Sequence, residues 1–167
     1  MLAAIPTQAQ DVAIENIKLK QFRGVSSIEG EGYYTFYVDE KTQRGKRLFA
    51  LDIFDLDLNH INKEKIEMPK RADLNEGEFN GQTFLFNFMD IKSKEATYII
   101  FDKKGKEIKR RTDGDIRRIM MTEDFYPQIF PAGDAGFYIV KAIKDGKIGY
   151  QVEKVDNNLR TEWEETY

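Results

Sequence analysis

The chain has 167 residues, of which 41% are hydrophobic and 13% aromatic, so it can bury a core and is expected to form one domain. Its formal net charge of −3 provides no overall basic field, which argues against nucleic acid and anionic lipid as partners. The absence of cysteine excludes disulfides, thiolate metal sites and a cysteine nucleophile.

The first ten residues carry part of the pattern of a secretion signal. Thr7 and Ala9 are small residues at the −3 and −1 positions of a signal-peptidase cut before Gln10. The preceding apolar run is shorter than the about 7–15 residues of a complete signal, so we interpret residues 1–10 as the remnant of a signal peptide. This predicts an exported protein, with a cytoplasmic protein that has a flexible N-terminus as the alternative. No later apolar run approaches the about 18 residues of a membrane-spanning helix, and no transmembrane segment is expected.

From residue 10 onward the apolar residues alternate or cluster with the period of β-strands, and Phe, Tyr, Ile and Val are enriched. One stretch, residues 112–125, could instead form a short helix capped by Asp113 or Asp115, although a strand or an irregular connection fits it equally well. An all-β protein is therefore predicted. Its expected strands lie at residues 33–38, 47–58, 83–91, 96–101, 136–143 and 149–155.

One pattern occurs three times, in units that start at Gly32, Gly81 and Gly136. Each unit has a glycine, an aromatic-rich strand, a polar loop, a second strand that ends in an apolar residue and Asp, a polar turn, and another strand. The starts are about 50 residues apart, close to the roughly 40–50 residues of propeller repeats. The pattern predicts that one structural unit is reused along the chain.

The aspartates of the polar turns have a structural role in this prediction. Asp57, Asp102 and Asp156 are expected to accept backbone N–H groups two residues further on, while Gly105 or Asn158 adopts the positive φ of a tight turn. The alternative, in which the three carboxylates meet at a shared site, is less favoured.

The units resemble the blades of β-propellers over roughly residues 32–167, through phrases such as "YIIFDKKGKEI". The stretch "IENIKLKQFRGVSSIEGEGYY" is similar to the N-terminal part of a family of secreted bacterial proteins of unknown function. The resemblance implies about three blade-like antiparallel sheets, with an open β-sandwich or partial barrel as alternatives, and a bacterial protein that is periplasmic, outer-membrane-associated or secreted. It supplies no catalytic residue for this chain.

In this interpretation residues 11–167 form a single β-repeat domain with units near 32–80, 81–135 and 136–167. Three blades do not readily close a ring, since propellers have about four to eight. The domain is therefore expected to be part of a larger protein, or to self-associate through open strand edges.

The metal candidates are weak. Asp55, Asp57 and Asn59 share one face of an extended chain, but a calcium loop would need glycine where His60 stands and glutamate where Ile66 stands. A solvated strand end is the preferred reading, and His60 is expected to be a surface or turn histidine.

Candidate binding residues come from the aromatic residues and from the loop 126–136, which contains two prolines and two glycines. Most aromatic side chains should lie in the core, but an exposed cluster could stack on a sugar. The ligand-binding candidates are Tyr126, Phe130, Asp134 and Trp163.

These features favour a non-catalytic binding or interaction module with a protein or glycan partner and no cofactor. A glycan-binding or glycan-hydrolysing propeller is one alternative, and a structural scaffold of the cell envelope is another. Hydrolysis would need two carboxyl groups about 5–10 Å apart across a cleft. The acids considered for it are Asp55, Asp57, Glu123 and Asp134. The basic run 103–118 is interpreted as a solvated surface.

Overall fold

The structure, a computed structural model, describes residues 22–28, 30–39, 45–114, 126–145 and 147–167. These residues form twelve β-strands and no helix, which confirms the all-β prediction. The described residues therefore contain no helix long and apolar enough to span a membrane. The strands are β1 (Phe22–Ile28), β2 (Gly32–Asp39), β3 (Lys46–Phe54), β4 (His60–Pro69), β5 (Asp73–Phe79), β6 (Thr83–Asp90), β7 (Glu95–Asp102), β8 (Glu107–Asp113), β9 (Gln128–Pro131), β10 (Phe137–Asp145), β11 (Lys147–Val155) and β12 (Thr161–Thr166).

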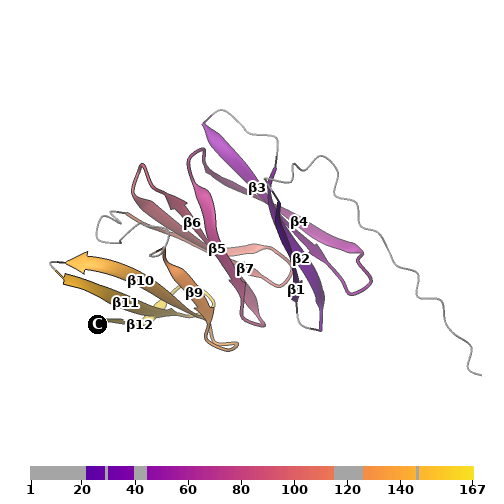
Figure 1. The fold of residues 1–167 in the computed structure, drawn as a ribbon. Coiled ribbons are helices and arrows are strands. Elements are labelled where there is room, and N and C mark those ends of the chain that lie inside the picture. Colours follow the sequence, from indigo (N-terminus) through magenta and orange to yellow (C-terminus); the bar gives the residue numbers. More distant parts are fainter. Residues whose placement is uncertain (1–21, 29, 40–44, 115–125, 146) are drawn as a thin grey trace, which may run out of the picture.

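The strands form three antiparallel four-stranded sheets, none of which closes on itself. Sheet A contains β1 to β4, sheet B contains β5 to β8 and sheet C contains β9 to β12, each in chain order. The sheets are stacked with sheet B between sheets A and C (Figure 1). The arrangement is consistent with an open partial propeller or an open sandwich, as the sequence predicted.

Sheet B is covered on both faces, and its sequence shows why. All eight residues of β6, "TFLFNFMD", are buried, and so are the six central residues of β7. A strand that is covered on both faces reads as a continuous apolar run instead of an alternation. By contrast, β12 at the edge of sheet C is exposed along its whole length.

The two joints between the sheets each contain a hydrophobic core. We call the face of sheets A and B that turns toward the following sheet the back face, and the opposite face the front face. In sheet C the front face is the one that packs on sheet B, and the other face is its back face. The A–B joint packs the back face of sheet A on the front face of sheet B, around buried residues such as Phe36, Phe49, Phe86 and Phe88. The B–C joint packs the back face of sheet B on the front face of sheet C, around Leu85, Tyr98, Ile100, Phe137 and Ile139.

Strand pairing aligns the three sheets residue by residue. Tyr33 pairs with Phe54 in sheet A, Phe84 with Phe101 in sheet B, and Phe137 with Val155 in sheet C. Gly32 and Gly136, where two of the predicted units begin, directly precede the first residue of their pair. In sheet B the corresponding position is held by Thr83, and Gly81 lies two residues before it.

Steric contact explains the two glycines at this position. A Cβ atom on Gly32 would lie 2.0 Å from the carbonyl oxygen of Phe54, and one on Gly136 would lie 2.0 Å from that of Val155. Any larger residue there would therefore require the backbone to move apart.

The sheets and the predicted repeat units differ in phase. The units begin at or just before β2, β6 and β10, whereas the sheets begin with β1, β5 and β9, which is one strand earlier.

The same aspartate turn joins the third and fourth strands of every sheet. Oδ1 of Asp102 accepts the N–H groups of Lys104 and Lys106, each at 2.9 Å. Asp156 accepts those of Asn158 and Arg160 at 2.8 and 2.9 Å in the same way. The prediction of capped turns at these two positions is confirmed.

Two details of the turn prediction were wrong. In sheet A the capping residue is Asp55, not Asp57, and its Oδ1 accepts the N–H groups of Asp57 and Asn59 at 2.9 and 2.8 Å. In sheet C the residue with positive φ is Leu159 (56°), not Asn158. The sequence pattern placed each of these residues one or two positions away, because Asp and Asn are also common beside the capping position.

The helix candidate at 112–125 lies largely outside the described residues. Thr112 and Asp113, its first two residues, belong to β8.

Candidate functional site

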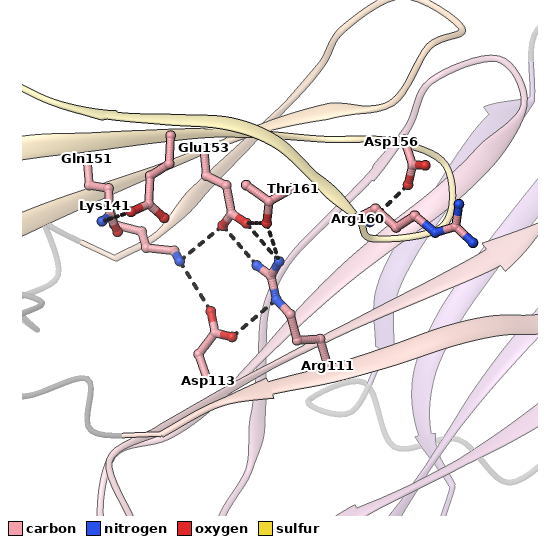
Figure 2. A network of polar contacts seen from close by, with 9 residues as sticks. Arg111, Asp113, Lys141, Gln151, Glu153, Asp156, Arg160 and Thr161 are labelled. Atoms are coloured by element: carbon pink, nitrogen blue, oxygen red, sulfur yellow. Dashed lines mark hydrogen bonds and ion pairs between the residues drawn. The ribbon is translucent and has the colours of Figure 1, made fainter.

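A network of buried charges crosses the B–C joint (Figure 2). The two Nη atoms of Arg111, from β8, donate to the two carboxylate oxygens of Glu153, from β11, at 2.7 and 2.8 Å. Lys141 on β10 bridges Glu153 and Asp113 at 3.3 and 3.2 Å, and Thr161 donates to Glu153 at 2.6 Å. Only 3% of Glu153 is exposed. Its carboxylate is bound by Arg111 from sheet B and by Lys141 and Thr161 from sheet C.

The network determines the ionisation of its central acid. Burial by itself would raise the pKa of Glu153, but hydrogen bonds from Arg111 and Thr161 and the charges of Lys141 and Arg111 lower it below the ordinary value. The Arg111 guanidinium and the Lys141 ammonium also lie 5.4 and 5.5 Å from the ring centre of the buried Tyr98. Every charged group here has a partner, which is the arrangement of a structural ion network.

A second polar cluster lies on the front face of sheet A, at corresponding positions. Asp52 accepts the hydroxyl of Tyr37 at 2.6 Å and lies 2.7 Å from Nε2 of His60. The register matches Asp52 with Glu153, Tyr37 with Lys141, and His60 with Thr161. His60 is therefore part of a hydrogen-bonded cluster around a buried acid.

Burial raises the pKa of Tyr37 above its usual range, and the neighbouring Asp52 raises it further, so the phenol stays neutral and donates its proton. Lys63 donates to the same hydroxyl at 2.6 Å. The sequence analysis missed Asp52, although a carboxylate inside the apolar run "FALDIF" was the available signal.

The predicted binding residues do not meet at one place. Phe130 on β9 and Trp163 on β12 both lie on the back face of sheet C, and they are 47% and 40% exposed. The Trp163 ring lies 6.0 Å from that of Tyr138 on the same face. Asp134 lies in the β9–β10 connection, where its backbone oxygen accepts the side chain of Asn157 at 2.7 Å.

Tyr126 lies elsewhere, at a cavity of about 560 Å³ beside sheet B. The cavity is bounded by the start of β5, by the β6–β7 turn and by Tyr126 itself. Nδ2 of Asn75 donates to the side-chain Oδ1 of Asn87 at 3.1 Å and to the backbone carbonyl oxygen of Pro127 at 2.8 Å, which holds the segment after Tyr126 against β5.

The acids considered for hydrolysis are not brought together. Asp55 and Asp57 lie in a turn of sheet A and Asp134 lies in sheet C, with sheet B between them. Glu123 lies outside the described residues. The Asp55 carboxylate caps its own turn and also accepts Nδ2 of Asn59 at 2.9 Å, and these bonds lower the pKa of Asp55. The residues that the structure describes contain no group of three acids or histidines placed to hold a metal ion.

The basic run contributes to the joints between sheets. Arg111 binds Glu153, Arg110 donates to the carbonyl oxygen of Glu67 in sheet A at 3.1 Å, and Lys103 pairs with Glu31. Three of the basic side chains that the structure describes in this run are thus engaged within the protein, whereas Lys106 and Lys109 are exposed.

Comparison of the sequence with known protein families gives a match. The model of a family of unknown function, DUF6770, matches residues 1–167. The chain is a member of this DUF6770 family. A search of curated proteins gave no match. Membership in DUF6770 therefore assigns no activity, and a function must be argued from the geometry.

Proposed function

We propose that this DUF6770 chain is a non-catalytic interaction module of an exported bacterial protein, and that the back face of sheet C is its binding surface. One observation carries the proposal. The back faces of sheets A and B are each covered by the next sheet, whereas the corresponding face of sheet C has no described sheet against it.

Corresponding positions on the three back faces show that this surface keeps an apolar character. Tyr34 in sheet A and Leu85 in sheet B correspond to Tyr138 in sheet C, and Phe49 and Ala96 correspond to Tyr150. Four apolar side chains of this face are more than a third exposed. They are Phe130, Ile148, Tyr150 and Trp163. Monomeric proteins rarely expose large apolar surfaces without a partner.

The partner that we propose is a second copy of this chain. Blade-like sheets pack on one another in propellers, and both joints inside this molecule show that its sheets do so. The back face of sheet C also carries charges of both signs, with Lys154 and Glu165 on neighbouring strands. Two copies related by a twofold axis can therefore place apolar side chains and opposite charges against each other.

Sedimentation velocity over a range of concentrations tests this proposal. We expect the chain to form a dimer that Tyr150→Lys prevents, because a buried lysine would lose its hydration at the interface. Leu56→Lys is the matched control, since Leu56 is 59% exposed in a turn of sheet A. A chain that stays monomeric to about 1 mM, or a dimer that Tyr150→Lys leaves intact, overturns the proposal.

Glycan binding on the same face is the second candidate, and the exposed Trp163 beside the half-buried Tyr138 favours it. Trp163 is the single tryptophan of the chain, so its fluorescence reports directly on this surface. Titration with neutral and acidic oligosaccharides should change that fluorescence if sugars stack there, and Tyr138→Ala, which keeps Trp163 as the reporter, should weaken the binding. An unchanged spectrum at saturating sugar rejects this candidate.

Export rests on the pattern at Thr7 and Ala9. Fractionation of the producing bacterium tests it, with the protein expected outside the cytoplasm. Recovery in the cytoplasmic fraction alone would contradict it.

A further inference from the structure

The cavity beside sheet B is a separate feature from the back face of sheet C. Its volume of about 560 Å³ lies within the range of small-molecule sites, which is roughly 300–1,000 Å³. Its walls come from two parts of sheet B and from Tyr126, which precedes sheet C, so distant parts of the sequence form it.

The two carboxylates in the cavity wall already have partners. Asp90 is 8% exposed, and its Oδ1 accepts the N–H groups of Lys92 and Ser93 at 3.0 and 3.1 Å. Asp73 forms an ion pair with Arg47. The charge of Asp73 is therefore neutralised by Arg47, and the Asp90 carboxylate is engaged by the backbone of its own turn.

The two cationic side chains of the wall remain available. Arg71 and Lys92 are exposed, and neither forms an ion pair with any residue in the described ranges. With Asp73 paired to Arg47, the wall carries two cationic groups against the single carboxylate of Asp90, so its charge balance is positive although the whole chain carries a net charge of −3. A site of this kind attracts an anion.

The rest of the wall suits an apolar or ring-shaped group. Leu74, Met89 and Ile91 contribute aliphatic surface, and Tyr126 contributes an aromatic ring with a hydroxyl. Asn75 fixes the backbone beside Tyr126 through its bond to Pro127, so this part of the wall is formed before a ligand enters.

We propose that this cavity binds a small organic anion. Its acidic group lies between Arg71 and Lys92, and its ring or aliphatic part lies against Tyr126 and Met89. Arginine binds carboxylate and phosphate oxygens in a bidentate manner, and lysine adds a point charge, so both acid types fit the chemistry.

Chemical-shift perturbation in ¹H–¹⁵N spectra tests the proposal with three matched probes. These are benzoate, phenyl phosphate and the neutral benzyl alcohol. We expect one or both anions to shift the amide signals of residues 73–75 and 90–92, with an affinity at least about tenfold above that of benzyl alcohol. The stronger of the two anions identifies carboxylate or phosphate as the preferred acid. Inorganic phosphate, tested alone, shows how much of the binding needs the ring.

Variants locate the binding. Arg71→Gln combined with Lys92→Gln should weaken the anion at least about tenfold, while Lys65→Gln, an exposed lysine of sheet A, should leave it unchanged. Equal binding of benzyl alcohol, full affinity in the double variant, or no shifts up to about 20 mM ligand would each overturn the proposal. Tyr150→Lys, which tests the back face of sheet C, should not alter anion binding, so the two proposals fail independently.

Discussion

The A–B and B–C joints both pack one four-stranded sheet on the next, but with different side chains at their centres. In the A–B joint the centre is aromatic, with the Phe36 ring 4.7 Å from that of Phe86 and the Phe49 ring 5.0 Å from that of Phe88. In the B–C joint, Lys141 and Glu153 stand at the positions that Phe88 and Ile99 hold in sheet B. One strand register thus accommodates either an apolar or an ionic joint.

The difference shows what each chemistry contributes. Apolar burial stabilises without strict direction, since it depends on the area removed from water. A buried ion network must instead meet its partners at fixed distances, because an unpaired buried charge is strongly destabilising. We infer that the A–B joint contributes most of the stability and that the B–C joint fixes which residues of the two sheets meet.

The largest expected effect is in the A–B joint. Phe86 is 2% exposed and its ring contacts those of Tyr34, Phe36, Phe84 and Phe101. Phe86→Ala should lower the free energy of unfolding by about 3–5 kcal/mol, measured by chemical denaturation, because it leaves a cavity among these rings. Phe130→Ala, at a half-exposed ring, should cost well under half as much; equal losses would contradict the importance of this joint.

Charge removal in the B–C joint should show its dependence on pairing. Glu153→Ala leaves Arg111 and Lys141 without their shared carboxylate and should cost about 3 kcal/mol in denaturation experiments. The triple variant Glu153→Leu, Arg111→Met and Lys141→Leu should recover most of that loss, because no unpaired cation remains to be buried and Asp113, which loses both partners, is partly exposed to water. A triple variant less stable than Glu153→Ala would show that the ion network itself stabilises the joint.

Acid should weaken the B–C joint selectively. The pKa of Glu153 is lowered in the folded protein, so its contribution to stability is present above the ordinary value of 4.5 and is lost as the pH falls through the folded pKa. Glu153→Gln should therefore reduce the loss of unfolding free energy between about pH 7 and about pH 3.

Glu76 supplies the opposite control for this titration. Burial raises its pKa, although the N–H of Ile129 donates to its carboxylate at 2.6 Å and partly offsets the shift. Its ionised form therefore opposes folding at neutral pH, a cost that is relieved as the pH falls through the raised folded pKa. Glu76→Gln should change the pH dependence in the direction opposite to Glu153→Gln, and the same sign for both would refute the assignment.

The smallest effects are expected in the turns. Leu58 and Leu159 both have positive φ, at 61° and 56°, where glycine is favoured. Leu58→Gly should be neutral or stabilise by up to about 1 kcal/mol, since Leu58 is only partly buried. Leu159→Gly should destabilise, because Leu159 is 5% exposed and packs in the B–C core. Thermal unfolding measured for both variants separates backbone strain from packing, and stabilisation by both would show that strain dominates.

The periodicity of the sequence predicted the two central strands of each sheet and their threefold reuse, because alternation and turn residues are local signals. The first strand of each sheet, which is β1, β5 or β9, was not predicted. The partner of a buried charge is not a local signal. Arg111 belongs to a basic run and Glu153 to an alternating strand, and only the stacking of sheets B and C brings them together. The binding candidates were dispersed for the same reason, since Tyr126 and Trp163 were chosen as residue types before their faces were known. Alignment of the three strand registers would have matched Glu153 with Asp52 and marked both as unusual acids in apolar strands.

The connectivity of the sheets has a consequence for how the chain folds. Within the described residues every hydrogen-bonded strand pair joins strands that are consecutive in the sequence. Contacts that are close in sequence form early and favour fast folding, so each sheet can assemble from its own segment before the next is needed. Sheet A would then expose its aromatic back face until β6 and β7 have formed and pack on it. Sheet B would expose its back face until β10 and β11 have formed. During synthesis the growing chain therefore exposes one apolar sheet face at a time. Because translation proceeds from sheet A to sheet C, the next sheet of the same chain is the first surface available to cover each face.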